Sequence, residues 1–152
     1  MTSTKKNALN IVGLAARTSN DPGKADQDIP KLWEKFIAEN TLNRIPNKVD
    51  QTLYAIYTDY EGDHTKPYTI VIGCNVSKLD NIPEDMTVKM IPESNYTKFI
   101  AKGDLTKDAV ISTWMDIWNT NLNRTYTTDI EIYGEKAIDP TNGEAEILIA
   151  TK

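Results

Sequence analysis

The residues best suited to chemistry lie in one strand-like stretch near the C-terminal end, Thr-Thr-Asp-Ile-Glu-Ile-Tyr over positions 127–133. Polar and apolar side chains alternate there, so the two isoleucines are expected on one face of a strand. Asp129, Glu131 and Tyr133 are then expected on the other face. A carboxyl group beside a tyrosine can attract a cation or, when its pKa is raised, exchange a proton with a substrate.

A predicted helix just upstream of this strand could enclose the acid. Trp114 and Trp118 are four residues apart, which is helical spacing, and apolar residues surround them. If the helix packs on the strand, Glu131 enters an aromatic pocket, where removal from water raises its pKa. The alternative is a solvated strand face, since glutamate is seldom fully buried without a partner.

The overall composition is that of a soluble globular protein of one domain. The chain has 152 residues, of which 39% are hydrophobic and 26% charged, enough to form a sizeable core. Its formal net charge is −5, and its lysines and arginines are scattered, so direct binding of nucleic acid is not expected. No apolar segment reaches the length of a membrane span, and the short apolar run after Lys5 and Lys6 is expected to be a strand. These features predict a cytoplasmic protein without membrane contact.

The single cysteine and the single histidine exclude several kinds of site. Cys74 lies in an apolar stretch over 68–76 and is expected to be a small core residue, so neither an internal disulfide nor a cysteine-based zinc cluster is possible. His64 lies in a polar loop and is expected at the surface. No metal-ligand spacing and no glycine-rich phosphate motif occurs, so we expect neither a metal nor a cofactor.

The expected elements fall into two similar halves. The first half has strands over 8–18, 53–60 and 68–76, a helix over 29–40 with Asp28 as its cap and Pro30 in its first turn, and a loop over 43–47. The second half has strands over 87–91, 96–102, 127–133 and 145–150 and a helix over 106–119, capped by Asp104 or Thr106. Each half therefore contains a strand–helix–strand–strand unit.

Short sequence echoes indicate an internal duplication. Ala55-Ile56-Tyr57 matches Glu131-Ile132-Tyr133, each on the strand that follows a helix. The predicted repeats cover about 7–80 and 86–151 of a single domain over 1–152. The first repeat then has Ala55 where the second has Glu131, an asymmetry typical of a site at the join between two copies.

The order of these elements resembles the GyrI-like, or effector-binding, domain superfamily, the small-molecule-binding half of several bacterial multidrug-responsive transcription activators. The resemblance spans about residues 7–150 and depends on the tryptophans of both helices, the motif over 129–133 and the final Glu-Ile-Leu-Ile strand. It implies an α+β fold in which duplicated β-α-β-β units form a curved antiparallel sheet with two helices and a cleft between the repeats. Because only a few residues precede the first predicted strand, we expect a standalone sensor without the regulators' helix-turn-helix domain.

The resemblance also implies the residues of the site. Glu131 corresponds to the acid that attracts lipophilic cations in the drug-binding relatives. The rings expected to line the pocket are Tyr57, Trp114 and Tyr133, followed by Trp33, Phe36 and Trp118, although the tryptophans would equally suit a plain helix-face core. Such a pocket would bind small lipophilic, cationic or aromatic molecules promiscuously.

The sequence is also compatible with two other functions. Some standalone members of the superfamily are regarded as hydrolases of electrophilic cyclopropane-containing toxins, which use pocket glutamates. Glu131 would then be catalytic, and Glu34 on the first helix is a possible second acid, although it also fits a solvated helix surface. The third possibility is a protein-interaction or inhibitor module, which the acidic charge balance allows.

Overall fold

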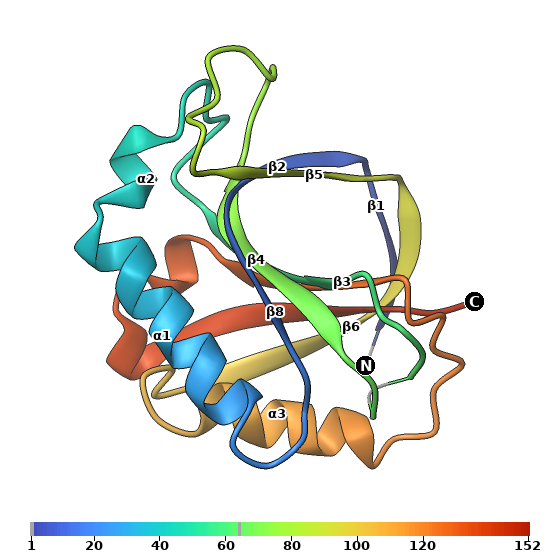
Figure 1. Ribbon diagram of the computed structural model, residues 1–152. Coiled ribbons are helices and arrows are strands. Elements are labelled where there is room, and N and C mark those ends of the chain that lie inside the picture. Colours follow the sequence, from blue (N-terminus) through green and yellow to red (C-terminus); the bar gives the residue numbers. More distant parts are fainter. Residues whose placement is uncertain (1, 64) are drawn as a thin grey trace.

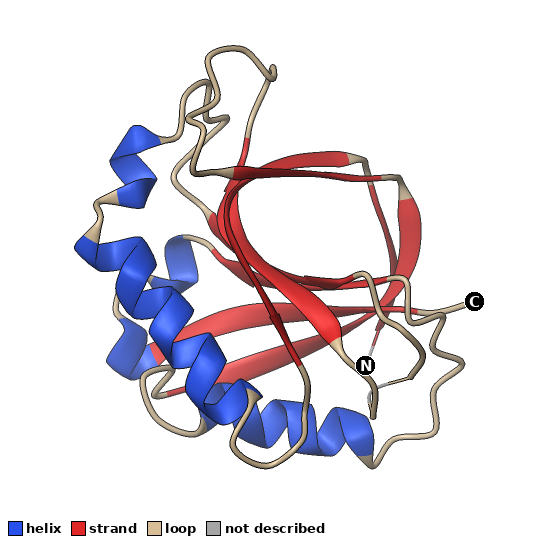
Figure 2. Cartoon of the chain, in the orientation of Figure 1, coloured by secondary structure: helices blue, strands red, loops and turns tan. Residues whose placement is uncertain are grey.

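The computed structural model describes residues 2–63 and 65–152, so the expectation for His64 lies outside the described residues (Figures 1 and 2). The strands are β1 (Thr2–Lys6), β2 (Leu9–Thr18), β3 (Leu53–Thr58), β4 (Tyr68–Asn75), β5 (Thr87–Ile91), β6 (Ser94–Gly103), β7 (Thr128–Tyr133) and β8 (Gly143–Ala150). The helices are α1 (Ala25–Ala38), α2 (Thr41–Arg44) and α3 (Ala109–Trp118), with short 3-10 helices η1 (Glu135–Ala137) and η2 (Pro140–Asn142).

The strands form one antiparallel sheet in the order β1-β6-β8-β7-β3-β4-β2-β5. Strands β3 and β7 pair at its centre and place Ala55 directly opposite Glu131. Strand β1 pairs with β6, whereas β5 pairs with β2, so the leading strand of each half lies at the outer edge of the other half. The predicted α+β class with an antiparallel sheet is confirmed, and the repeat boundaries at 7–80 and 86–151 stay a prediction.

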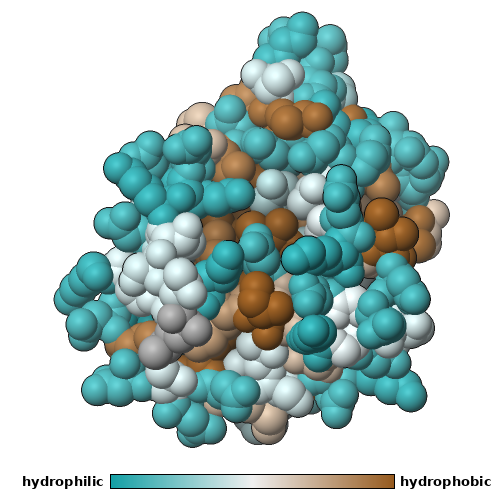
Figure 3. All heavy atoms as spheres, turned by 180° about the vertical axis from the view of Figure 1, so that it is seen from behind, coloured by the Kyte–Doolittle hydropathy of each residue, from teal (hydrophilic) through white to brown (hydrophobic). Residues whose placement is uncertain are grey.

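Both faces of the curved sheet are covered. Helices α1 and α3 lie along one outer side of it (Figure 2), where Phe36 and Trp114 join the larger hydrophobic core. On the opposite face a second cluster, which includes Tyr54 and Ile130, packs within the curve of the sheet. The rear surface is mostly hydrophilic, with apolar groups in separate patches (Figure 3). Because β7 is covered on both sides, its acidic side chains enter the interior along with its isoleucines.

Helix α1 begins at Ala25, four residues before the predicted start. The predicted cap, Asp28, lies in its first turn, and its carboxylate accepts a hydrogen bond from the hydroxyl of Thr18 at 2.8 Å. Asp26 and Asp28 place negative charge at the positive end of the helix dipole, which favours the earlier start. Pro30 therefore lies inside the helix and not in its first turn.

Other predicted boundaries were also wrong. Residues 2–6, expected to precede the first strand, form the edge strand β1. The end of α2 occupies part of the predicted loop over 43–47. Helix α3 begins at Ala109, and neither predicted cap starts it, because Asp104 accepts hydrogen bonds from the Thr106 amide and hydroxyl in a separate turn.

Strands β2 and β4 approach so closely at Gly13 and Gly73 that no side chain fits between them. These glycines face each other in the β2–β4 ladder. A Cβ atom on Gly13 would overlap the carbonyl oxygen of Ile72, and one on Gly73 would overlap that of Val12. Strands β2 and β4 are both visibly curved (Figure 1), and a glycine inside a strand often marks a bend or a close backbone approach.

Replacing Gly73 by alanine should lower the free energy of unfolding by about 3 kcal/mol, because backbone must move to admit the methyl group. The control is Gly134→Ala, where the nearest atom to a new Cβ is the Thr52 hydroxyl at 3.8 Å. That variant should lose less than about 1 kcal/mol. Urea unfolding followed by circular dichroism measures both, and equal midpoints for the two variants would contradict the close approach.

Candidate functional site

Glu131, in the middle of β7, lies inside the protein with an exposed fraction of 2%. Its Oε2 atom accepts hydrogen bonds from the hydroxyl of Tyr57 at 2.6 Å and from the indole nitrogen of Trp114 at 2.7 Å. Its Oε1 atom accepts one from the hydroxyl of Tyr133 at 2.6 Å. These donors come from β3, α3 and β7, so the carboxyl group lies where helix α3 meets the centre of the sheet.

The chemistry of the donors restricts where a proton can sit on this carboxyl group. An indole N–H only donates, so a proton on Glu131 cannot point from Oε2 toward Trp114, whereas the hydroxyl of Tyr57 or of Tyr133 can accept such a proton by turning its own hydrogen away. Burial raises the pKa of Glu131, and the bonds from Tyr133, Tyr57 and Trp114 oppose that rise. Burial and the nearby carboxylate raise the pKa of Tyr57 and of Tyr133 well above the usual range, so both hydroxyls keep their protons at neutral pH.

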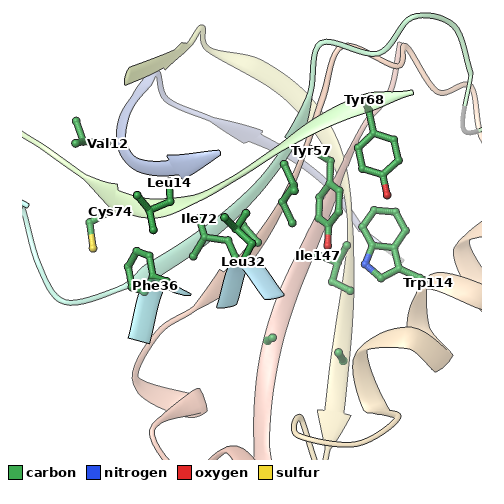
Figure 4. Packing of buried hydrophobic residues seen from close by; sticks show 14 of the residues in the cluster. Val12, Leu14, Leu32, Phe36, Tyr57, Tyr68, Ile72, Cys74, Trp114 and Ile147 are labelled. Carbon is green, nitrogen blue, oxygen red and sulfur yellow. The ribbon is translucent and has the colours of Figure 1, made fainter. Parts of the chain in front are cut away.

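The rings nearest to Glu131 pack against one another. Tyr57 meets Trp114 edge to face with centroids 5.2 Å apart, and its other neighbour, Tyr68, lies at 5.8 Å. Burial, followed by the charge of Glu131, raises the pKa of Tyr68 to about 12. Figure 4 shows these three rings together at one end of the core, with Cys74 and Phe36 at the other. The carboxyl group therefore has an aromatic wall on the side of β3 and α3.

The other predicted rings extend this aromatic array in two directions. Trp33 of α1 packs edge to face on Tyr133 with centroids 5.5 Å apart. The ring centroid of Phe36 lies 6.3 Å from that of Trp33. Trp118 lies 6.3 Å from Trp114 and is 40% exposed. Tyr57, Tyr133 and Trp114 thus contact the acid directly, whereas Trp33, Phe36 and Trp118 reach it only through another ring.

The three donors occupy the positions that a ligand of Glu131 would use. Two surface hollows of about 330 and 340 Å³ lie elsewhere, one beside Lys102 and Lys136 and the other beside Lys5 and Tyr96. Since Glu131 is almost fully buried, a ligand can contact it only after a side chain around it has moved.

Sequence reasoning missed a second buried acid, Asp129, on the same face of β7. It is fully buried, and its Oδ2 atom accepts hydrogen bonds from Tyr60 at 2.5 Å and Arg124 at 2.8 Å, while Oδ1 accepts one from the Ala150 amide at 2.9 Å. The alternation in β7 was the available signal, because it placed Asp129 beside Glu131. Glu34, considered as the second acid, is exposed on α1.

Cys74 is buried, and burial raises the pKa of its thiol to about 11, which confirms it as a core residue. Among residues 2–63 and 65–152, no group of three or more histidine, cysteine or acidic side chains could hold a metal ion. None of the helices in that part of the chain is long and apolar enough to cross a membrane.

The sequence as a whole matches a known class of protein. The model of the Cass2 family, integron-associated effector binding protein, matches residues 4–151. The chain therefore belongs to this family, and the predicted relation to effector-binding domains is confirmed. Small-molecule binding is the class of function that the family supports.

Relatives of this chain match it over nearly their whole length. The protein YobU of Bacillus subtilis (strain 168), provisionally described as a transcriptional regulator, is 28% identical over 146 residues, which are 93% of this chain and 91% of YobU. The Vibrio cholerae integron cassette protein VCH_CASS2 is 29% identical, with a TM-score of 0.76 and coverage of 99% and 95%. The structure of SAV2435 bound to tetraphenylphosphonium has a TM-score of 0.80 at 18% identity, with coverage of 99% and 93%, which shows the same fold.

Replacing Glu131 by glutamine removes the titrating group and keeps its size. Because the pKa of Glu131 is raised in the folded protein, its contribution to stability is fully present below its ordinary pKa of 4.5 and is lost as pH rises through the raised value. The melting temperature of the wild type should therefore fall relative to that of Glu131→Gln between about pH 4 and about pH 8. Glu34→Gln, at an exposed position, is the control and should follow the wild type. A difference between wild type and Glu131→Gln that does not change with pH would contradict the raised pKa.

Proposed function

We propose that this protein binds lipophilic organic cations through Glu131. The observation that carries the proposal is a buried carboxyl group with three hydrogen-bond partners. All three are aromatic side chains, and none of them is a cation. Membership of an effector-binding family supports small-molecule binding in general. The complex of the structural neighbour SAV2435 with tetraphenylphosphonium supports a lipophilic cation as the ligand class.

The energetics favour a positively charged aromatic ligand. Removal from water disfavours the charged form of Glu131, and a bound cation restores that form by direct attraction. Contact of the cation with the faces of Trp114, Tyr57 or Tyr133 adds about 0.5–2 kcal/mol for each ring. Apolar contact with these rings depends little on ligand shape, so the site accepts several ligands and not one metabolite.

Entry of a ligand requires movement, and Trp114 is the donor best placed to move. Tyr57 and Tyr133 belong to the paired central strands β3 and β7. Trp114 belongs to α3, whose main contacts are with β6 and whose Met115 and Trp118 are 53% and 40% exposed. A displaced indole frees one position on Oε2 and adds its ring to the wall of the opened pocket.

The arrangement supports binding more than hydrolysis. General acid–base hydrolysis by two carboxyl groups needs a second acid that is free to act on water or substrate. Asp129 is held by Arg124, Tyr60 and the Ala150 amide, and Glu34 is exposed on α1. A cytoplasmic location and a protein partner stay predictions from the sequence.

Tetraphenylphosphonium should quench the tryptophan fluorescence of the wild type, because the cation must contact Trp114 to reach Glu131. Affinity should fall about tenfold or more in Glu131→Gln, which keeps the shape of the site but loses its charge. Glu34→Gln, which removes a charge from the surface of α1, should bind as the wild type does. Affinity is measured by fluorescence titration and calorimetry. Equal affinity of the wild type and Glu131→Gln would show that Glu131 does not bind the cation.

Affinity for the same cation should rise with pH in the wild type, because only the ionised form of Glu131 attracts it and the pKa of this group is raised. Titrations between about pH 5 and about pH 8 should show this increase, with protons released on binding. Glu131→Gln should show a flat profile. A flat profile in the wild type would mean that the acid is already ionised or takes no part.

A further inference from the structure

Asp129 and Arg124 form an ion pair inside the protein, beside the aromatic site. The guanidinium nitrogen lies 2.8 Å from Oδ2, and the side chains of Arg124 and Asp129 are only 7% and 0% exposed. The hydroxyl of Tyr60 donates to the same oxygen, and Tyr60 packs on Tyr68 with centroids 5.6 Å apart. The pair is therefore continuous with the ring wall that encloses Glu131.

The surroundings of Arg124 resemble a cation-binding site that the chain fills with its own side chain. The guanidinium lies over the ring of Tyr126 at 4.4 Å from its centroid, a cation–π contact, and faces the carboxylate of Asp129. Its Nε atom is buried without a hydrogen-bond partner in the described structure. Because a guanidinium keeps its charge at neutral pH, this buried position holds a fixed positive charge beside Asp129.

The charges of the two acids differ in how they are balanced. Asp129 and Glu131 lie on the same face of β7, about 7 Å apart along the strand. Arg124 balances Asp129, whereas Glu131 has no ion-pair partner among residues 2–63 and 65–152. Without Arg124 the interior beside the rings would hold two acids with no ion-pair partner in place of one, and a bound cation would favour the ionised form of each.

We propose that Arg124 determines the charge class of the ligand: it neutralises Asp129, so the site carries one free negative charge and selects monocations over dications. This inference rests on the proposed function. A dication could place one charge near each acid of β7, but in the wild type its second charge meets the guanidinium of Arg124. A monocation meets only Glu131 and avoids that repulsion.

Two single variants change the charge balance of the site in opposite directions, and their combination restores it. Arg124→Gln leaves both acids uncompensated, Asp129→Asn leaves Arg124 uncompensated, and the double variant restores the wild-type balance. The probes are tetraphenylphosphonium and the dication p-xylylenebis(triphenylphosphonium), compared as a ratio of affinities by calorimetry. Arg44→Gln is the control, because it breaks an ion pair with Asp85 at 3.0 Å that lies at the surface.

Arg124→Gln should shift the affinity ratio toward the dication by about tenfold or more, and Asp129→Asn should weaken binding of the monocation by a similar factor. The double variant should return to within about threefold of the wild-type ratio, and Arg44→Gln should not change it. If Arg124→Gln does not fold, Asp129→Asn and its recovery in the double variant carry the test. Arg124→Lys, which keeps the charge, should then retain the wild-type ratio.

Unchanged ratios in the folded single variants, or no recovery in the double variant, would overturn this inference while leaving monocation binding intact. An equal loss of affinity for both probes would show that the ion pair has a purely structural role. This result would also overturn the inference. A wild type that binds neither probe would overturn the proposed function and this inference together.

Discussion

Two of the three hydrogen bonds to Glu131 join parts of the chain that are distant in sequence. Tyr57 lies 74 residues and Trp114 17 residues away, and together with Tyr133 they allow an acid to exist where water cannot reach it. Aromatic donors reduce the penalty of burying the charge without cancelling the charge itself, as a lysine or arginine would. Among the described residues the carboxyl group of Glu131 therefore has aromatic donors but no cationic partner, and the proposed binding of a cation depends on this feature.

The position of this acid follows from the topology of the sheet. The central pair β3–β7 puts Ala55 opposite Glu131, and the small alanine side chain leaves the space around the carboxylate to the rings. A twofold axis through Ala55 and Glu131 would exchange the flanking pair Tyr54–Ile132 with the flanking pair Ile56–Ile130. The predicted duplication, which matches the sequence at Ala55 with that at Glu131, requires this relation. A duplicated chain can keep one acid at such a join and avoid two facing carboxylates.

Sequence patterns identified the centre of this arrangement but not its surroundings. Alternation in β7 placed Glu131 and Tyr133 on one face, and helical spacing placed Trp114 where it could meet them. The same alternation implied that one face of β7 could be solvated, so the burial of Asp129 and its pairing with Arg124 were missed, because coverage on both sides depends on the curvature of the whole sheet. Strand β1 was missed because Thr-Ser-Thr-Lys-Lys lacks apolar residues and exists only through its pairing with β6.

A crystal structure of the protein with tetraphenylphosphonium would show directly whether Glu131 binds the cation. We expect the phosphonium against the carboxylate of Glu131, with the Trp114 indole moved out of hydrogen-bonding distance and the tyrosines of β3 and β7 still in place. A cation bound at another surface, with all three hydrogen bonds to Glu131 intact, would contradict it.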